Sequence, residues 1–503
     1  MFGFSAILVL ARRAAPPQGC SAILEAVGGA CDTEYHFTIS QAQRRGIRPA
    51  MNLLLARPLS ARSIPLVILL FSVGVLAANR LHHLLCLRIA DVECVRYWPI
   101  GVFFPRIPPY IGFPSPVHIL TGLAALALFL VALSVLPRAD YRPLLVSAFS
   151  GVLLLTTTLT HGWQFGLVRP SAAAPNVGPD YYQDALAITN PLAFISDFNV
   201  AQPDLSVHSR THPPGAVLTF YLLQRLTRDP GMISIVIAGL AVGFTALFLR
   251  KLLSTEFDLR TVGRILFLFF LIPSVQIYYA ATVDALLAPL IVGSCLALIL
   301  KSRWWLLVSI ACLLLASFLS FGFVFVLPVL LAFDIWRFRA PWRTGVLFLS
   351  LVLFYVFLDA LLRFSYPSSF LTAAHLENPQ GFRLIAQPAD YLMSRIEDVA
   401  EIVVFFGPFL LIMLVSGLAA LKPRRPLTTL SALAIFNLFL VFLSGAYQTG
   451  ETARGALFIY PFLILPVAER VARDDMTHMD YARLAGLVFL QTLLMQLVGD
   501  YWW

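Results

Sequence analysis

The chain has 503 residues, of which 59% are hydrophobic and 13% are charged, and its 36 basic and 27 acidic residues give a formal net charge of +9. Soluble globular chains contain about 45–50% apolar and about 25% charged residues, so this composition excludes a soluble enzyme, a disordered chain and a collagen-like fibre. It indicates an integral membrane protein with many helical spans. No basic stretch interleaved with aromatic residues lies outside the apolar segments, so we expect no nucleic-acid partner.

Residues 1–62 precede the first apolar window of span length. This segment carries several arginines and no window long enough to cross a membrane. We expect a cytoplasmic tail that is disordered, or one that lies outside the mature chain if translation starts at Met51. A single transmembrane domain is expected over residues 63–500.

Thirteen apolar windows follow that can cross a bilayer core of about 30 Å as helices. They are apolar on all sides, which is typical of spans, and the alternation of membrane β-strands is missing. The predicted fold class is therefore all-α: a polytopic transmembrane helical bundle of about thirteen spans. The windows are residues 64–78, 117–136, 144–159, 233–249, 265–279, 285–300, 304–319, 321–336, 346–362, 402–421, 427–445, 456–467 and 484–498.

The charges of the loops predict the orientation of the chain. All three lysines and many arginines fall in the short loops, whereas the long loops are poorer in them, so the long loops are expected outside. The longest of these outer loops are 160–232 and 363–401. This arrangement requires that residues 215–226 do not cross, and we expect there an amphipathic helix on the outer surface.

Four polar clusters then fall on the same outer face. Each has an ordinary interpretation: Asp180 can cap a helix, and Glu451 and Arg454 can form a helical ion pair. Ionisable groups that adjoin spans, such as Asp284 and Arg454, more often line a polar cavity than face lipid. The coincidence of all four clusters on one face favours a functional site. The clusters are residues 178–185, 209–215, 278–284 and 448–454.

The order of these clusters resembles that of the GT-C class of polytopic glycosyltransferases, which includes protein O-mannosyltransferases, lipid A aminoarabinose transferases and oligosaccharyltransferases. In the first two families, a long outer loop carrying juxtamembrane helices opens with a motif close to P-D-E-x-x-Y/x-A. Here Pro179-Asp180-Tyr181-Tyr182-Gln183-Asp184-Ala185 is similar, with Tyr181 where the family often has a second acid.

Two later motifs continue the resemblance. His212-Pro213-Pro214-Gly215 is similar to the H/K-P-P-L/G motif of these families, and residues 273–279 followed by Asp284 are similar to a span that ends in P-x-x-x-x-Y before an aspartate. The resemblance covers roughly residues 143–300. Beyond it the chain matches only in hydropathy, apart from Glu451 and Arg454. Two spans precede the one that enters the long loop, where those families commonly have one.

The resemblance implies a hexosyl- or pentosyltransferase that moves a sugar from a polyprenyl-phosphate donor to an acceptor hydroxyl at the outer face, with inversion at the anomeric carbon. The chain also has no nucleotide-binding fingerprint of the G-x-x-x-x-G-K-[ST] or G-x-G-x-x-G kind. A lipid-linked donor suits an enzyme that works outside the cytoplasm. Neither the sugar nor the acceptor, whether protein, lipid or polysaccharide, follows from the sequence.

This chemistry assigns a role to each candidate residue. Asp180, with Asp184 second, is expected to take the proton of the acceptor hydroxyl, and His212 is expected to assist or orient. Arg210 and Arg454 are expected to offset the charge on the departing phosphate. The reaction requires no cofactor or metal, although four carboxylates have the oxygens to bind a divalent cation. Further substrate contacts are expected from Tyr182, Tyr279, Asp284 and Glu451.

Two other functions remain open at this point. A transporter or flippase of a lipid-linked glycan would suit intramembrane charges and many spans, but the chain lacks an inverted repeat. A glycan polymerase or ligase that uses lipid-diphosphate donors would also have large outer loops with arginines. The arginine-rich, lysine-poor composition is typical of a GC-rich genome, so we expect a bacterial inner membrane with the active site facing the periplasm or exterior.

Overall fold

The computed structural model describes residues 60, 63–89, 115–174, 178–280, 282–300, 302–419, 425–447, 451–473, 476–499 and 501. The chain divides into two units, Met1–Met51 and Asn52–Trp503, and all described residues belong to the second. The predicted tail over residues 1–62 therefore lies outside the described residues, except for Ser60.

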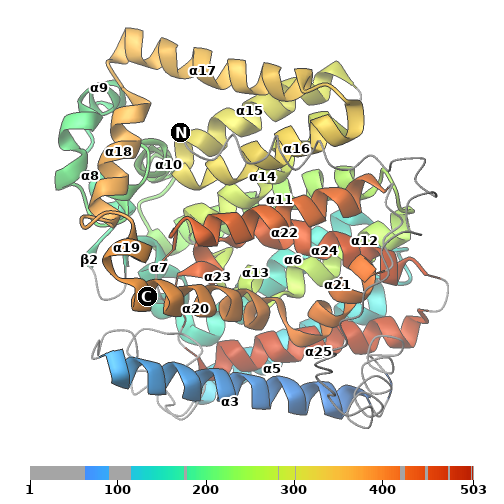
Figure 1. Ribbon diagram of the computed structural model, residues 1–503. Coiled ribbons are helices and arrows are strands. Elements are labelled where there is room, and N and C mark those ends of the chain that lie inside the picture. Colours follow the sequence, from blue (N-terminus) through green and yellow to red (C-terminus); the bar gives the residue numbers. More distant parts are fainter. Residues whose placement is uncertain are drawn as a thin grey trace, which may run out of the picture. The chain divides into compact units, whose positions relative to one another are not determined.

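The described part of the chain is helical, apart from one antiparallel pair of two-residue strands, β1 and β2 (Figure 1). The amino-terminal elements are α3 (Ser63–Ile89), α5 (Pro116–Val135), α6 (Pro143–Thr158), η2 (Leu159–His161), η3 (Gln164–Val168), α7 (Arg169–Ala172), β1 (Ala173–Ala174), β2 (Gly178–Pro179), α8 (Tyr181–Leu186), α9 (Pro191–Ala201), η4 (Gln202–Asp204), η5 (Ser209–Thr211), α10 (Gly215–Gln224), α11 (Pro230–Leu253), α12 (Leu259–Leu271) and α13 (Pro273–Tyr278). The carboxy-terminal elements are α14 (Val283–Ile299), α15 (Arg303–Leu319), η6 (Phe321–Phe325), α16 (Val326–Phe338), α17 (Trp342–Leu362), α18 (Tyr366–Glu377), α19 (Arg383–Ala386), α20 (Pro388–Phe406), α21 (Pro408–Ala419), α22 (Pro426–Leu443), α23 (Thr452–Gly455), η7 (Leu457–Ile459), α24 (Tyr460–Val471) and α25 (His478–Val498).

Six described helices are long and apolar enough to cross a membrane, and the bent pair α20–α21 makes a seventh if it counts as one span. The six are Pro116–Val135, Pro143–His161, Pro230–Leu253, Phe321–Phe338, Trp342–Leu362 and Pro426–Leu443. Shorter apolar helices occur at Ser63–Ala78, Gly215–Gln224, Val283–Ile299 and Arg303–Leu319. A polytopic helical membrane protein is thus supported, whereas the number thirteen stays a prediction.

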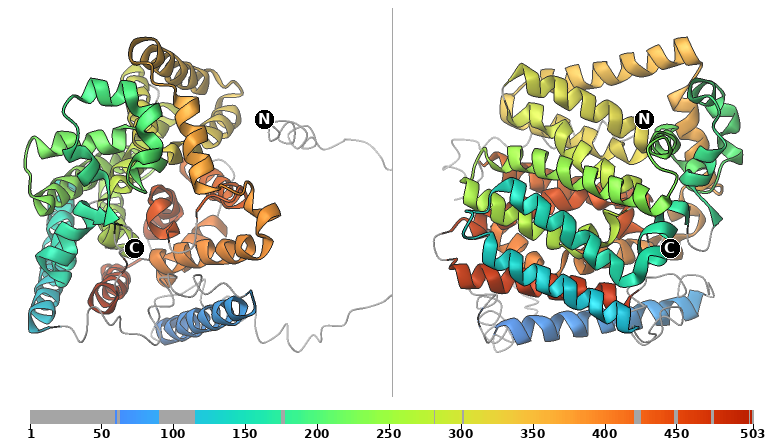
Figure 2. Two further views of the ribbon diagram at one scale, coloured as in Figure 1. Left: turned by 90° about the vertical axis from the view of Figure 1, so that its left-hand side faces the viewer. Right: turned by 180° about the vertical axis from the view of Figure 1, so that it is seen from behind.

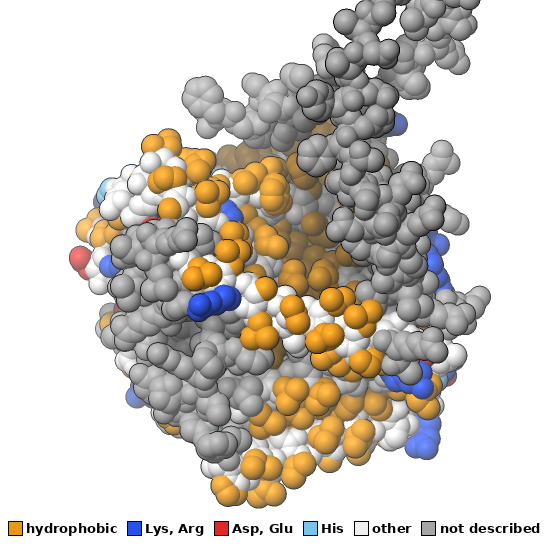
Figure 3. All heavy atoms as spheres, turned by 60° about the horizontal axis from the view of Figure 1, so that its bottom comes forward, with side chains coloured by type: hydrophobic (Ala, Val, Ile, Leu, Met, Phe, Trp, Pro, Cys, Tyr) orange, Lys and Arg blue, Asp and Glu red, His pale blue; other side chains and the backbone are white. Residues whose placement is uncertain are grey.

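The outward faces of several helices are apolar, as a lipid environment requires. On α3, Ile68, Leu69, Leu70 and Val73 are all about half exposed, and hydrophobic side chains cover much of the face shown in Figure 3. Lys and Arg side chains gather mainly toward its right-hand edge. Exposed apolar area of this extent is unfavourable in water and favourable in a bilayer.

The shorter elements α8, α9, α10, α18 and α19 gather at one end of the bundle, which we call the loop end (Figures 1 and 2). The two predicted outer loops meet there. Asn199 Nδ2 donates to the Ser365 carbonyl at 2.9 Å, and Ser365 N–H donates to Asn199 Oδ1 at 2.8 Å. Gln202 Nε2 donates to the Ser369 carbonyl at 3.0 Å. Loops 160–232 and 363–401 therefore share one end of the bundle.

The window 265–279, predicted as one span, is interrupted between α12 and α13. Pro273 has no N–H and its ring disfavours a helical conformation before it, so the carbonyls of the preceding turn lose their helical partners. Thr492 Oγ1 donates to the Leu271 carbonyl at 2.7 Å, and Gln276 Nε2 donates to the Phe270 carbonyl. Because water is scarce in the bilayer, these side chains satisfy backbone groups that the break exposes.

A second interruption separates α20 from α21, which meet at 99°. Gly407 lies at the bend with φ +94°, a conformation that favours glycine, and a Cβ there would lie 2.7 Å from Gln491 Oε1. The predicted span 402–421 is therefore bent, and the predicted loop 363–401 contains α18, α19 and most of α20.

The segment 215–226, predicted not to cross, forms the ten-residue helix α10. At 1.5 Å per residue it is about 15 Å long, half the thickness of the hydrocarbon core. It differs from the expected surface helix because Ala216, Val217 and Phe220 are buried within the protein. The helix packs against α8 and thereby supports the predicted acidic motif.

Candidate functional site

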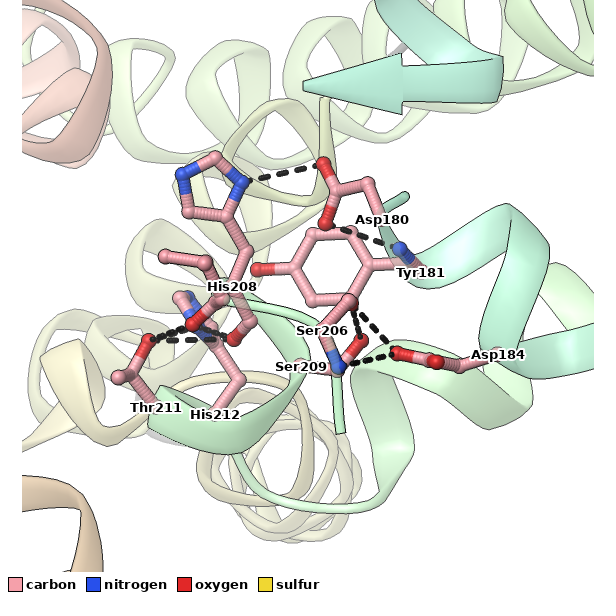
Figure 4. A network of polar contacts seen from close by, with 9 residues as sticks. Asp180, Tyr181, Asp184, Ser206, His208, Ser209, Thr211 and His212 are labelled. Atoms are coloured by element: carbon pink, nitrogen blue, oxygen red, sulfur yellow. Dashed lines mark hydrogen bonds and ion pairs between the residues drawn. The ribbon is translucent and has the colours of Figure 1, made fainter. Parts of the chain in front are cut away.

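Asp180 lies at the loop end, at the start of helix α8. It follows the β1–β2 pair and is the N-cap of α8, where its Oδ1 accepts a hydrogen bond from Tyr181 N–H at 2.9 Å. Its second oxygen, Oδ2, lies 3.1 Å from His208 Nδ1 (Figure 4). Asp180 as a whole is only 8% exposed. Asp180 is therefore both a helix cap and half of a buried carboxylate–imidazole pair, and sequence analysis missed the second half, His208.

The electrostatic environment keeps Asp180 ionised. Burial raises the pKa of this carboxyl, but the hydrogen bond and charge of His208, the Tyr181 amide and the charge of Arg454 together lower it below its ordinary value. A carboxylate at neutral pH is able to accept a proton from a hydroxyl group. This is the state that a general base requires.

Asp184, one turn further along α8, makes structural hydrogen bonds to the segment that follows. Its Oδ2 accepts hydrogen bonds from the backbone N–H of Ser206 at 3.1 Å and from Ser206 Oγ at 2.5 Å. The hydroxyls of Ser206 and Ser209 lie 2.9 Å apart. Asp184 thus anchors the segment that carries His208 and His212 to α8 (Figure 4).

His212 is held as a neutral imidazole. Its Nδ1 lies 2.9 Å from the His208 carbonyl, and because a carbonyl only accepts, we assign the proton to Nδ1. Burial and the charge of His208 lower the pKa of His212 to about 4. At neutral pH its Nε2 is left with a lone pair that can accept a hydrogen bond from a substrate hydroxyl.

Tyr181 forms the aromatic wall between the two histidines. Its ring stacks against His208 and Phe220 at centroid distances of 6.2 and 5.8 Å and meets His212 edge-on at 5.5 Å. Burial, followed by the charges of Asp180 and Asp284, raises the pKa of Tyr181 well above its ordinary value, so the phenol is neutral. Tyr181 therefore contacts both imidazoles.

Arg454 links Asp180 electrostatically to Asp284 and Glu451, which belong to the third and fourth predicted clusters. Burial alone would lower the pKa of this guanidinium, but the negative charges of Glu451 and Asp284 raise it. The same positive charge acts on Asp180. Asp284 lies in the first turn of α14, after the N-cap Thr282, whose Oγ1 accepts a hydrogen bond from Ala285 N–H at 3.2 Å. We call this group the charged cluster: Asp180, His208, His212, Asp284, Glu451 and Arg454.

Three predicted site residues have other surroundings. The Tyr279 hydroxyl lies 3.1 Å from Thr245 Oγ1 in the core, and its ring packs edge-on against Phe269 and Phe270, so it does not join the charged cluster. Tyr182 is a structural link, because its hydroxyl donates to the Arg228 carbonyl at 2.7 Å.

Arg210, the third of these residues, lies in η5 between His208 and His212. Its carbonyl accepts a hydrogen bond from Gln202 Nε2 at 2.9 Å. Within the described part of the chain, its buried Nε has no hydrogen-bond partner. The role predicted for it in binding phosphate stays a prediction. Residues 448–450 of the fourth predicted cluster lie outside the described residues.

Sequence analysis also missed three buried acids on α20. Glu397, Asp398 and Glu401 are at most 1% exposed, whereas Leu392 and Ile396 on the same helix are about half exposed. Their spacing places the acids on one face of a helix, and ionisable residues close to a span usually mark a functional region. That signal was present in the sequence, within a segment interpreted as a loop.

The charged cluster does not form a metal site of the usual kind. Among the residues that the structure describes, no three His, Cys, Asp or Glu side chains are grouped so that they could hold a metal ion. The charges of Glu451 and Asp284 instead act on the guanidinium of Arg454. Comparison with protein-family models, with curated proteins and with solved structures finds no match for this chain.

Proposed function

We propose that this protein transfers a sugar from a polyprenyl-phosphate donor to an acceptor hydroxyl at the loop end of the membrane domain. The observation that carries the proposal is that the buried carboxylate of Asp180, which is paired with His208, lies within reach of the charge of Arg454. Transfer from a sugar phosphate needs both: a base for the acceptor and a cation for the leaving group.

The chemistry assigns one task to each group. Asp180 takes the proton of the acceptor hydroxyl while the acceptor oxygen bonds to the anomeric carbon. The bond from that carbon to the phosphate oxygen breaks at the same time, and the configuration inverts. The electron pair stays on the departing polyprenyl phosphate, whose charge Arg454 offsets. His212, neutral and with its proton on Nδ1, is suited to accept a hydrogen bond at Nε2 from a sugar or acceptor hydroxyl.

The apolar surroundings suit a donor with a prenyl chain. Leu392, Ile396 and Val399 of α20 are exposed on the outside of the bundle, close in sequence to the acids that face inward. A prenyl chain can pack against such a surface while its phosphate reaches the charged cluster. A soluble nucleotide-sugar donor would gain nothing from this arrangement.

The test is a transfer assay with the full chain in native membranes and a panel of radiolabelled polyprenyl-phosphate sugars. Replacement of Asp180 by Asn should lower the rate about 10²–10⁴-fold. Asp229→Asn is the matched control, since Asp229 also caps a helix, with Oδ1 accepting from Gly231 N–H at 2.7 Å. Equal rates for the two variants, or no transfer from any donor by the wild-type protein, would contradict the proposal.

The product distinguishes the alternatives. Sugar transfer releases polyprenyl monophosphate, a lipid-diphosphate-dependent polymerase or ligase releases polyprenyl diphosphate, and a flippase releases neither. If polyprenyl-phosphate and polyprenyl-diphosphate donors are both supplied with the label in the prenyl chain, thin-layer separation of the lipid products separates the three functions.

The orientation has its own test. We expect the loop end to face the periplasm or exterior of a bacterial inner membrane. Thr189 and Thr255 are both exposed, the first at the loop end and the second in a predicted cytoplasmic loop. In intact cells, a membrane-impermeant maleimide should label Thr189→Cys and not Thr255→Cys. The opposite pattern would reverse the topology.

A further inference from the structure

Arg454 lies in a short helical turn that is fixed by hydrogen bonds to another helix, α20. The helix α23 has four residues, too few to be stable by its own hydrogen bonds. Thr452 Oγ1 donates to Asp398 Oδ1, and the backbone N–H of Ala453 donates to Glu401 Oε2 at 3.0 Å. The two residues that precede Arg454 are therefore both bound to buried carboxylates of α20.

Arg395 extends this connection to the end of α22. Its Nη2 lies 3.1 Å from Asp398 Oδ2, and its guanidinium donates to the carbonyls of Phe442, Ala446 and Tyr447. The distances to the Ala446 and Tyr447 oxygens are both 2.9 Å. A fork of this kind fixes several backbone groups at once. Both the segment before α23 and α23 itself are thus bonded to the same helix.

The cost of burying these acids calls for a reason. A carboxylate taken out of water is unfavourable unless hydrogen bonds and an opposite charge compensate it, and an apolar pair would fill the same space at less cost. On α20 the polar side faces the protein and the apolar side faces outward. Asp398 and Glu401 contact the turn that carries Arg454. Burying these acids is therefore explained if the protein needs that turn in a fixed position.

We propose that Asp398 and Glu401 are positioning residues that hold Arg454 at the charged cluster, so that its guanidinium meets the phosphate of the donor. The inference rests on the proposed function, because it assumes that Arg454 binds a lipid-linked phosphate. It adds two residues that are not expected to touch substrate or reacting atoms and that act through the Thr452 hydroxyl and the Ala453 N–H.

The test measures phosphate recognition directly, without knowledge of the sugar or acceptor. The purified full chain in lipid nanodiscs is titrated with polyprenyl monophosphate and with the uncharged polyprenol of the same length. The wild-type protein should bind the phosphate more tightly, and Arg454→Ala should lose about tenfold of that preference. Thr452→Val, which keeps the shape and removes the bond to Asp398, should lose most of it, while Thr452→Ser should keep it.

A double-variant cycle separates positioning from general damage. If Thr452 acts only through Arg454, adding Thr452→Val to Arg454→Ala should cause no further loss. Ser309→Ala is the control for the loss of a buried hydroxyl. Ser309 of α15 donates through Oγ to the Gly293 carbonyl of α14 at 2.9 Å, outside the site. This control should retain the full phosphate preference.

A second pair of variants covers the case in which Thr452→Val does not fold. Glu401→Gln keeps an oxygen for the Ala453 N–H and Glu401→Ala does not, so the preference should fall in the second and persist in the first. Equal effects of the two substitutions, or a phosphate preference that survives Thr452→Val and disappears in Arg454→Ala, would overturn the inference. A wild-type protein without any phosphate preference would instead reject the proposed function.

Discussion

The two sides of the charged cluster hold their ionisable groups in different ways. On one side, the oxygens of Asp180 bind the amide of the next residue and the imidazole of His208, 28 positions later in the same loop. On the other, Asp398 and Glu401 bind Thr452 and Ala453, which lie 54 and 52 positions further along the chain. The first side is completed by contacts within one loop, whereas the second exists only once α20 has packed against α23.

The two sides therefore differ in what they determine: the first sets the charge state of Asp180, and the second sets the position of Arg454. Around Asp180, the imidazole of His208 and the backbone amide of Tyr181 favour the charged form of a carboxylate. Around Arg454, fully buried carboxylates set the place of a cation. Substitutions on the first side should therefore move the pH limb that is set by Asp180, and substitutions on the second side should change the rate or affinity and leave that limb in place.

The largest effect should come from Arg454 itself. Replacement by Ala removes the cation that offsets the phosphate charge, and we expect the transfer rate to fall about 10²–10³-fold. Arg454→Lys should recover part of the rate, because lysine keeps the charge and loses the planar fork. Arg225→Ala is the control, as Arg225 is exposed and bonds Tyr221 Oη at 2.5 Å. A loss in Arg225→Ala as large as that in Arg454→Ala would remove the distinction.

His208→Gln should shift the pH profile of the reaction. His208 lowers the pKa of Asp180, so its loss raises that pKa and moves the acidic limb of kcat/KM to higher pH. Activity should fall most at low pH and recover as the pH rises. Other groups whose charges reach His208 or Asp180, and stay in the variant, are Asp284, His212 and Arg454.

A control variant and an effect on stability complete the test of the Asp180–His208 pair. Thr452→Val, on the second side, should lower the rate without moving the pH limb. A carboxyl with a lowered pKa in the folded protein adds stability above its unfolded pKa of about 3.9, and that stability is lost as pH falls through the folded pKa. His208→Gln should therefore lower stability at neutral pH and not at a pH below the folded pKa of Asp180. An unshifted limb would contradict the role of His208.

Gly407→Ala tests whether the bend between α20 and α21 supports the second side. The residue has φ +94° and little room for a Cβ, so we expect a loss of about 1–3 kcal/mol in the free energy of unfolding. Thermal unfolding in detergent measures it. Gly239→Ala is the matched control, since a Cβ at Gly239 meets nothing within 4 Å. A stability equal to that of the control would show that the bend tolerates a side chain.

The smallest effect is expected at the interruption before Pro273. Thr492→Val removes the donor to the Leu271 carbonyl and should cost about 1 kcal/mol. Thr156→Val, whose hydroxyl bonds only to its own helix at the Val152 carbonyl, should cost less. Unfolding of both variants under the same conditions gives the comparison, and an equal cost would mean that the freed carbonyl finds another partner.

Hydropathy predicted the helical class, and the loop charges predicted that residues 215–226 do not cross. It could not reveal the break at Pro273 or the bend at Gly407, because the segments on both sides are apolar and a sliding window does not register backbone geometry. It also missed α20: Glu397, Asp398 and Glu401 lower the hydropathy of that segment, although all three face inward.

The site was predicted in part for a similar reason. Asp180, His212, Asp284 and Arg454 were found because each adjoins a span or a recognisable motif. His208 has no motif around it, so only the fold reveals that its ring faces Asp180. Tyr279 sits beside Tyr278 in the sequence, but α13 turns it toward Thr245 in the core.

Composition and the apolar windows by themselves indicated a helical membrane protein, because the cost of exposing apolar surface to water depends mainly on residue type. Only the tertiary structure decided which carboxylate meets which cation. Those pairings depend on the direction of each side chain and on contacts between segments far apart in sequence, as between α20 and α23.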